Sequence, residues 1–114
     1  MRTNFNMTDE NITMVKGDTL AFNVEIKDND GEPVTVDSAY FTCKKNVAAV
    51  TPTFQKSLNN GIDQDDGLLT VRVAPADTSS LLAGQYYYDF QIGVGDDKYT
   101  LLRGILSLEQ DVTA

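Results

Sequence analysis

The fold class follows from an alternation of apolar and polar residues with a period of two. In "DTLAFNVEIKD", Leu20, Phe22, Val24 and Ile26 fall on one side and the residues between them fall on the other. Successive side chains of a β-strand point to opposite faces, so this pattern predicts a half-buried strand and not an amphipathic helix. We therefore expect an all-β chain.

Similar segments recur along the chain, with turn residues roughly every ten positions between them. We expect further strands within residues 12–15, 38–46, 51–58, 68–75, 85–94 and 99–110. Gly104 is expected to mark a β-bulge in the last strand, while "NNG" and "DQDDG" indicate loops. About seven short antiparallel strands with this spacing are typical of an immunoglobulin-like β-sandwich.

One short helical turn is expected near residues 76–83, within "PADTSSLLAG". Asp77 or Thr78 would cap the turn and Gly84 would end it, because these residue types favour those positions. The turn would carry the chain from one sheet to the other and place Leu81 or Leu82 at the end of the core.

Three consecutive tyrosines follow this turn, and they cannot all face the same way on a strand. We expect Tyr86 and Tyr88 to point inward and Tyr87 to point outward. In many sandwiches a tyrosine at this place buries its ring and donates a hydrogen bond across the corner. The stretch is therefore interpreted as a structural corner and not as a ligand platform, formed by Tyr86, Tyr88, Leu81 and Gly84.

The composition argues against catalysis and against nucleic-acid binding. The chain has 114 residues and a net charge of −8, whereas nucleic-acid binding needs clustered Lys and Arg. It has no histidine and a single cysteine, which removes the usual general base, the usual zinc site and any Ser-His triad. Cys43 lies on the apolar side of its strand and is expected to pack as a small hydrophobe. We expect no catalytic residue, no metal site and no cofactor.

The acidic loops and the basic residues are expected to have ordinary roles. Asp28 and Asp30 begin like a calcium loop, but Pro33 stands where that loop needs glycine. This loop, residues 63–67 and Asp96-Asp97 are interpreted as turns in which acidic side chains bond to nearby backbone. The alternative is a weak divalent-ion site formed by two loops at one end of the sandwich. Solvated strand faces are expected for Lys44, Lys45, Lys56 and Arg72.

The chain organisation indicates a single domain over residues 1–114, with residues 1–10 and 110–114 loose. The N-terminal "MRTNFNMTDENITM" lacks the apolar core of a signal peptide. No stretch approaches the length of apolar sequence that a membrane span needs, so we expect no membrane partner.

Three motifs occur in a fixed order along the chain. The first is "MVKGDTLAFNVEIKDNDGEPVTV", the second is "LLTVRVAPADTSSLLAGQYYYDFQI", and the third is "YTLLRGILSLEQDVT". In this order they resemble the immunoglobulin-like modules of tailed-phage and prophage tail or baseplate proteins. The resemblance covers about residues 14–113, and in outline the chain is similar to the N-terminal domain of phage baseplate upper proteins.

This resemblance implies a non-enzymatic structural protein that is made in the bacterial cytoplasm and located in the virion. Its partners would be other phage structural proteins or further copies of itself, reached through an unpaired edge strand or outward strand faces. Lys16-Gly17-Asp18 would be a turn, and the candidate interface residues are Tyr40, Tyr87 and Tyr99. The alternative is an immunoglobulin-like adhesion or carbohydrate-binding module of a bacterial surface protein.

Overall fold

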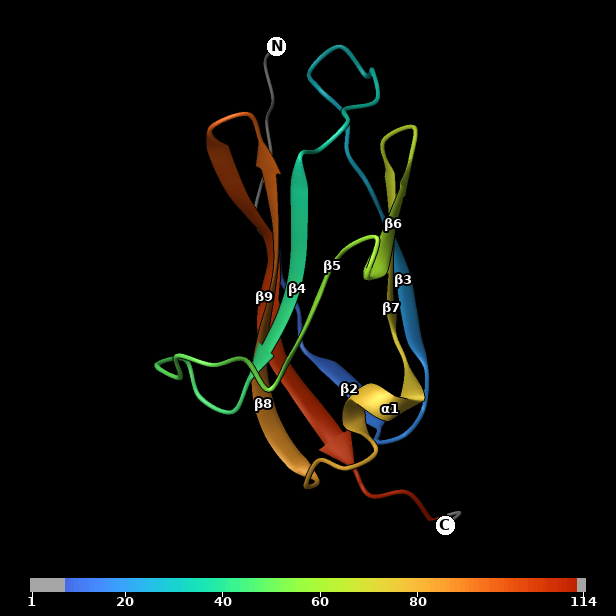
Figure 1. Cartoon of the computed structure of the whole chain (residues 1–114), viewed down its shortest axis with the longest axis vertical. Coiled ribbons are helices and arrows are strands. Elements are labelled where there is room, and N and C mark those ends of the chain that lie inside the picture. Colours follow the sequence, from blue (N-terminus) through green and yellow to red (C-terminus); the bar gives the residue numbers. More distant parts are fainter. Residues whose placement is uncertain (1–7, 113–114) are drawn as a thin grey trace.

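The computed structural model describes residues 8–112 as an immunoglobulin-like, all-β sandwich with one short helical turn (Figure 1). The fold class predicted from the alternation is therefore confirmed. The elements are β1 (Thr8–Asp9), β2 (Ile12–Val15), β3 (Leu20–Glu25), β4 (Ser38–Lys44), β5 (Phe54–Leu58), β6 (Gly61–Asp65), β7 (Leu68–Val73), α1 (Pro75–Thr78), β8 (Gly84–Val94) and β9 (Asp97–Glu109).

The strands form two facing layers that are joined along one side (Figure 1). The antiparallel strands β3, β7 and β6 make the smaller layer, and β9, β8, β4 and β5 make the larger one. A short parallel contact between β5 and β6 joins the layers, so the hydrogen-bonded order is β1-β9-β8-β4-β5-β6-β7-β3. β1 and β2 both run parallel to β9, which departs from the purely antiparallel arrangement that we expected.

The core between the layers is built from the inward residues of the alternating segments. Phe22 of β3 meets Phe41 and Phe90 of the opposite layer edge-on, with ring centroids 5.8 and 6.3 Å apart. Removing these apolar faces from water is the main force that holds the two layers together. The predicted strand phases are confirmed by the burial of Ala39, Phe41, Cys43, Leu69, Val71, Val73, Tyr86, Tyr88, Phe90 and Ile92.

Two predictions about the strands are wrong. Residues 61–65 form β6 and not a loop, because Ile62 is fully buried and the strand pairs with β7. The register between β8 and β9 shifts at Leu101, so the irregularity does not lie at Gly104.

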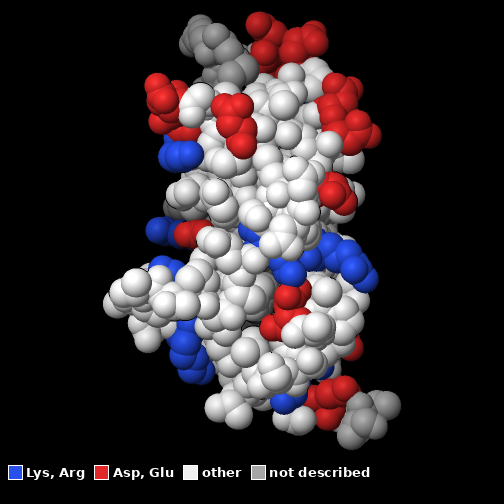
Figure 2. Space-filling model, in the orientation of Figure 1, with Lys and Arg blue, Asp and Glu red and all other residues white. Residues whose placement is uncertain are grey.

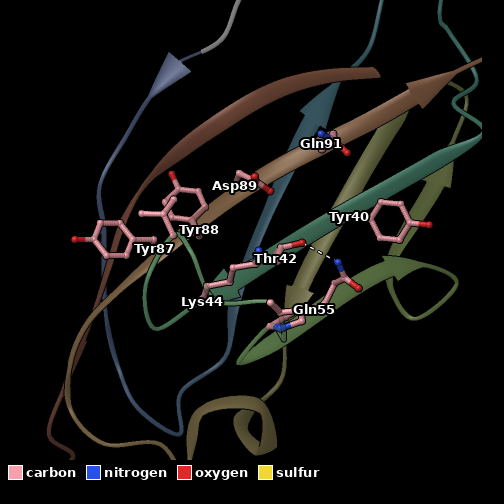
Figure 3. A pocket seen from close by; sticks show the side chains of 11 residues that line it. Tyr40, Thr42, Lys44, Gln55, Tyr87, Tyr88, Asp89 and Gln91 are labelled. Carbon is pink, nitrogen blue, oxygen red and sulfur yellow. Dashed lines mark hydrogen bonds between the residues drawn. The ribbon is translucent and has the colours of Figure 1, made fainter. Parts of the chain in front are cut away.

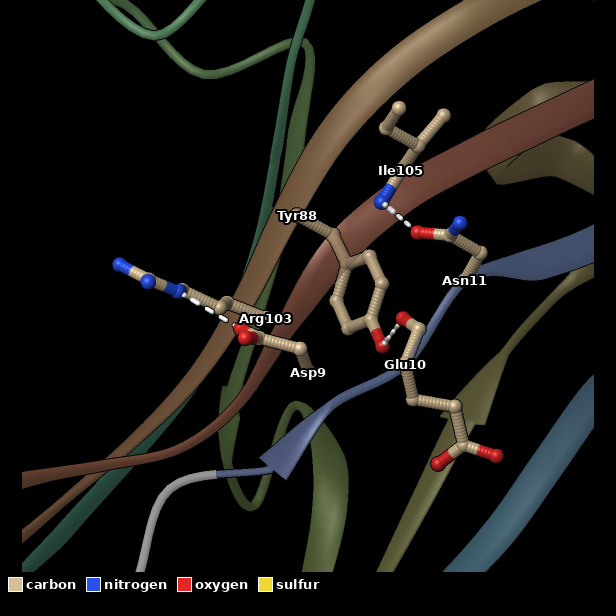
Figure 4. Close-up of polar contacts among 6 residues, drawn as sticks. All are labelled: Asp9, Glu10, Asn11, Tyr88, Arg103 and Ile105. Carbon is tan, nitrogen blue, oxygen red and sulfur yellow. Dashed lines mark hydrogen bonds and ion pairs between the residues drawn. The ribbon is translucent and has the colours of Figure 1, made fainter.

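Gly104 instead allows the N-terminal segment, residues 8–15, to approach β9 closely (Figure 4). A Cβ atom at this position would lie 2.1 Å from the backbone oxygen of Glu10. The parallel pairing with β9 is interrupted between β1 and β2, at Glu10 and Asn11, and side chains make hydrogen bonds across this gap. Asn11 Oδ1 accepts a hydrogen bond from the Ile105 backbone nitrogen at 3.0 Å, and the Tyr88 hydroxyl donates one to the Glu10 carbonyl.

Residues 8–10 are bonded to β9 and are not loose, whereas we expected residues 1–10 to be loose. Thr8 and Asp9 pair with β9, and Asp9 Oδ1 lies 2.9 Å from Arg103 Nε. Residues 1–7 and 113–114 lie outside the described residues. No helix among the described residues is long and apolar enough to cross a membrane.

α1 is shorter than the predicted helical turn and starts one residue earlier. It covers Pro75–Thr78, so Gly84 is the first residue of β8 and does not end the helix. The N-cap is Ala74, not Asp77 or Thr78. Asp77 nevertheless stabilises the first turn of α1, because its Oδ2 accepts a hydrogen bond from the Ala74 backbone nitrogen at 2.7 Å.

The turn at Lys16-Gly17-Asp18 packs against α1, and this contact fixes the start of β3. The Asp18 backbone nitrogen donates to the Val15 carbonyl at 3.1 Å, which confirms the predicted turn. The Gly17 backbone nitrogen donates to the hydroxyl of the fully buried Thr78 at 2.8 Å. Lys16 Nζ donates to the Leu81 carbonyl at 2.9 Å, so the β2–β3 turn and the segment after α1 hold each other in place.

Candidate functional site

The predicted corner is made by Tyr86. Its hydroxyl donates to the Leu82 carbonyl at 2.8 Å, four residues upstream, while its ring is buried. Lys45 Nζ lies 4.6 Å from the centre of this ring, on the outside of the corner. The Leu81 side chain packs partly against the core, whereas the Leu82 side chain is exposed. Burial raises the pKa of Tyr86 above its ordinary value.

Tyr88 has a different role from Tyr86, although both rings are buried. It stacks on Phe41, with ring centroids 5.4 Å apart, and its hydroxyl reaches Glu10 in the N-terminal segment. Burial raises its pKa, and the nearby carboxylates of Glu10 and Asp9 add to that shift. The structure therefore places Tyr86 at the corner and places Tyr88 under the N-terminal segment.

The outward side of the larger layer gathers polar and aromatic side chains from three neighbouring strands (Figure 3). Tyr87, Asp89 and Gln91 of β8 stand opposite Lys44, Thr42 and Tyr40 of β4, respectively. On β5, Gln55 Nε2 donates to the Thr42 hydroxyl at 2.9 Å. We call this surface the outer face, and it consists of Tyr40, Thr42, Lys44, Gln55, Tyr87, Asp89 and Gln91.

The outer face contains an open hollow of about 630 Å³, which is bordered by the loop between β4 and β5. That loop presents Val47 and Val50, which are 76% and 95% exposed. Tyr40 and Tyr87 are 39% and 41% exposed, so their rings are supported by the sheet and also reach solvent. Tyr87 and Val47 also line a second hollow of about 490 Å³, toward Arg103 of β9.

Asp89 lies in the middle of the outer face and is partly withdrawn from water. Burial raises the pKa of its carboxyl, and Lys44 acts in the opposite direction with a smaller effect. Arg103 stands opposite Asp89 on β9, but its Nε lies 2.9 Å from Asp9 instead. Asp89 is therefore a carboxylate whose charged form is disfavoured where it stands.

The three tyrosines that we expected at an interface do not share one surface. Tyr40 and Tyr87 both lie on the outer face. Tyr99 pairs with the buried Ile92 and packs against the core. The alternation of each strand predicts that Tyr40 and Tyr87 point outward. Their meeting on one face depends on the pairing of β4 with β8, which no local pattern specifies.

One of the three acidic segments, the turn that follows β3, has the side-chain chemistry that the sequence predicts. Asp28 Oδ1 accepts hydrogen bonds from the backbone nitrogens of Asp30 and Glu32, at 2.9 and 3.0 Å. Asp63 lies on β6 and not in a loop. Among the described residues, no group of three or more His, Cys, Asp or Glu side chains could hold a metal ion. Cys43 is fully buried, and burial raises the pKa of its thiol to about 12, so a thiolate is not available at neutral pH.

One basic residue differs from the expected solvated face. Lys56 Nζ lies 2.7 Å from Asp77 Oδ2, and the two side chains are only 14% and 18% exposed. This ion pair links β5 of the larger layer to α1. Lys45 lies over the Tyr86 ring, while Lys44 belongs to the outer face and Arg72 is exposed on β7.

Comparisons with known proteins give a limited result. The sequence matches no family model, and no curated protein matches it. Among solved structures, the chain is similar to the adhesin InvE of Yersinia pseudotuberculosis, with 19% sequence identity and a TM-score of 0.48. The match covers 88% of this chain and 24% of that one, so this chain spans about a quarter of the adhesin's length.

Proposed function

We propose that this chain is a non-enzymatic structural module of a phage or prophage tail or baseplate, and that it assembles with another structural protein through the outer face. The order of the three sequence motifs supports the tail or baseplate setting. The observation that carries the proposed mode of action is the pair of half-exposed tyrosines, Tyr40 and Tyr87, on adjacent strands beside two exposed valines.

The chemistry of the outer face suits a protein partner. Tyrosine buries a large apolar ring at low entropic cost and keeps a hydroxyl for hydrogen bonding, which is why it is favoured in interface centres. Thr42, Gln55 and Gln91 add uncharged groups that donate and accept hydrogen bonds. The face thus combines an apolar edge with polar groups, and its single carboxylate, Asp89, would be stabilised by a donor on a partner.

The proposal is tested in the phage or lysogen that encodes the chain, by purifying particles and measuring the chain in them by mass spectrometry. We expect a fixed ratio of the chain to the major tail protein. The double variant Tyr40→Ser/Tyr87→Ser should fold normally and be incorporated at least about tenfold less, since truncating interface aromatics commonly costs more than about 1 kcal/mol each. Arg72→Ser, which changes the outward side of the other layer, is the control and should be incorporated normally.

Two results would overturn the proposal. One is that the chain is absent from purified particles although it is expressed. The other is that the purified protein binds glycans on an array and that the double variant abolishes this binding. That second result would assign the same tyrosines to a carbohydrate-binding module.

A further inference from the structure

β3 forms one end of the hydrogen-bonded strand order and pairs only with β7 within residues 8–112. It lies at the outer side of the smaller layer (Figure 1). An edge strand carries a row of backbone donors and acceptors that can pair with another strand. The question is which groups β3 presents and what strand would fit them.

The hydrogen bonds at the end of β3 show which backbone groups face outward. The Ile26 backbone nitrogen donates to the carbonyl of Gly67, the residue just before β7, at 2.7 Å, so the N–H of Ile26 points to the β7 side of the strand. In an antiparallel pair this direction alternates along the strand. Leu20, Phe22 and Val24 therefore point their backbone groups toward β7. The N–H and C=O groups of Ala21, Asn23 and Glu25 point to the free edge.

This edge lacks the usual features that prevent pairing. β3 has six residues without proline or lysine, and its pairing with β7 is regular. Its only charged residue is Glu25, which lies at one end, 3.5 Å from Lys27 Nζ. The core-side residues Leu20, Phe22 and Val24 remain partly exposed, so an added strand would cover them.

We propose that β3 pairs antiparallel with β3 of a second copy of this chain around a two-fold axis, which joins two three-stranded layers into one sheet. In the register that places Phe22 opposite its own copy, Leu20 faces Val24 and Ala21 faces Asn23. Ala21 and Asn23 then form the hydrogen-bonded pairs that their outward backbone groups require. The apolar residues face apolar ones, and each copy's Glu25 faces Thr19, so like charges do not meet.

The charge distribution over the molecule also favours this arrangement. Acidic residues gather at the end of the sandwich where the β3–β4 connection lies (Figure 2). Antiparallel pairing sets these ends at opposite sides of the dimer. The turn before β3 carries one lysine and one aspartate, Lys16 and Asp18, so it adds no net negative charge where it lies beside the acidic end of the other copy. This inference concerns a different surface from the outer face and does not depend on the proposed tail function.

The test is the mass of the full chain in solution by light scattering across a concentration series at physiological salt, together with hydrogen exchange. We expect a dimer in which the amides of Ala21, Asn23 and Glu25 become protected as concentration rises. Asn23→Pro removes an edge N–H that does not point to β7, and it should weaken dimerisation at least about tenfold, which is about 1.4 kcal/mol. Ala21→Pro provides a second variant of the same kind.

Asn23→Ala is the matched control. It removes the side chain that accepts a hydrogen bond from the Thr70 hydroxyl at 3.0 Å, but it keeps the backbone N–H, so it should dimerise like the unmodified chain. A monomer at all concentrations whose three edge amides exchange freely would overturn the proposal. A dimer that both proline variants leave unchanged would overturn it as well. The exchange measurement on the unmodified chain remains decisive if neither proline variant folds.

Discussion

At the scale of single residues, Tyr86 and Tyr88 differ in the groups to which their hydroxyls bond, although the alternation predicts the same inward position for both. Tyr86 and Tyr88 are both buried, but Tyr86 bonds four residues upstream and Tyr88 bonds to Glu10, 78 residues earlier. Tyr86 therefore fixes a local corner, while Tyr88 holds a distant segment. Removing only the hydroxyl should therefore have different effects at the two positions.

We expect Tyr86→Phe to lower the free energy of unfolding by about 1 kcal/mol, because the ring stays buried and one hydrogen bond is lost. Tyr87→Phe should change it by less than about 0.5 kcal/mol, since that side chain lies on the surface. Denaturant unfolding of both variants checks the prediction. Equal losses for the two variants would show that the assigned phase of β8 is wrong.

Asp89 leads to a prediction about pH. Burial raises the pKa of its carboxyl in the folded chain, so the folded state binds this proton more tightly than the unfolded state does. The ionised carboxylate then costs stability above the folded pKa, and the cost disappears as the pH falls to the unfolded value. We expect Asp89→Asn to be more stable than the unmodified chain at neutral pH, with the difference vanishing at acidic pH.

The measurement for Asp89→Asn is denaturant unfolding at a series of pH values. Asp63→Asn, at an exposed position on β6, serves as the control and should show little difference from the unmodified chain at neutral pH. A gain in stability for Asp89→Asn that is the same at every pH would contradict the electrostatic cause. Packing of the amide would then explain the gain instead.

At the scale of elements, the N-terminal segment packs closely on β9 because Gly104 has no side chain. We expect Gly104→Ala to lower the free energy of unfolding by about 1–3 kcal/mol, because the new Cβ would collide with the Glu10 backbone. Hydrogen exchange should also become faster within residues 9–15. Gly31→Ala is the control: Gly31 has a positive φ of 81° but open space around it, so it should cost about 1 kcal/mol without changing that exchange. If Gly104→Ala instead lowered protection from hydrogen exchange equally throughout the chain, Gly104 would not act by holding residues 9–15 on β9.

The sequence predicts the elements well where burial follows the alternation. The alternation predicts the correct phase for β3, β4, β7 and β8, because each has one apolar face over several residues. The sequence does not indicate β6, because its residues and their neighbours are rich in Asn, Asp and Gly and Ile62 is its single fully buried residue. β1 has two residues, and its pairing with β9 depends on Gly104, far along the chain.

The candidate site was predictable only in part, for a related reason. Alternation indicates that Tyr40 and Tyr87 point outward, and it correctly assigns Cys43 to the core. It does not show which strands are neighbours, so the outer face could not be assembled from sequence. The sequence does not indicate the partly buried Lys56–Asp77 pair, because the pair joins β5 to α1 and lysine on a strand normally indicates a solvated face.

At the scale of the whole molecule, negative charge is concentrated at one end of the sandwich (Figure 2). The β3–β4 connection, the β6–β7 turn and the β8–β9 turn meet there. Asp37 Oδ2 accepts a hydrogen bond from the Gly95 backbone nitrogen at 2.5 Å, and Gly67 packs against Pro33. The carboxylates in or beside these three connections include Asp28, Asp30, Glu32, Asp37, Asp65, Asp66, Asp96 and Asp97. Their mutual repulsion destabilises the folded state. This repulsion is strongest at low ionic strength, where salt screens it least.

We therefore expect sodium chloride to raise the free energy of unfolding, on the order of 1 kcal/mol between low and physiological ionic strength. Asp96→Asn/Asp97→Asn should reduce that gain. Calcium chloride at matched ionic strength should act like sodium chloride, because the Asp28 carboxylate already bonds to its own loop. A specific site would bind the folded state and raise the melting temperature further, with saturation. A saturable calcium effect that Asp28→Ala removes would show that this acidic end binds the ion, and screening alone would then be the wrong account of these loops.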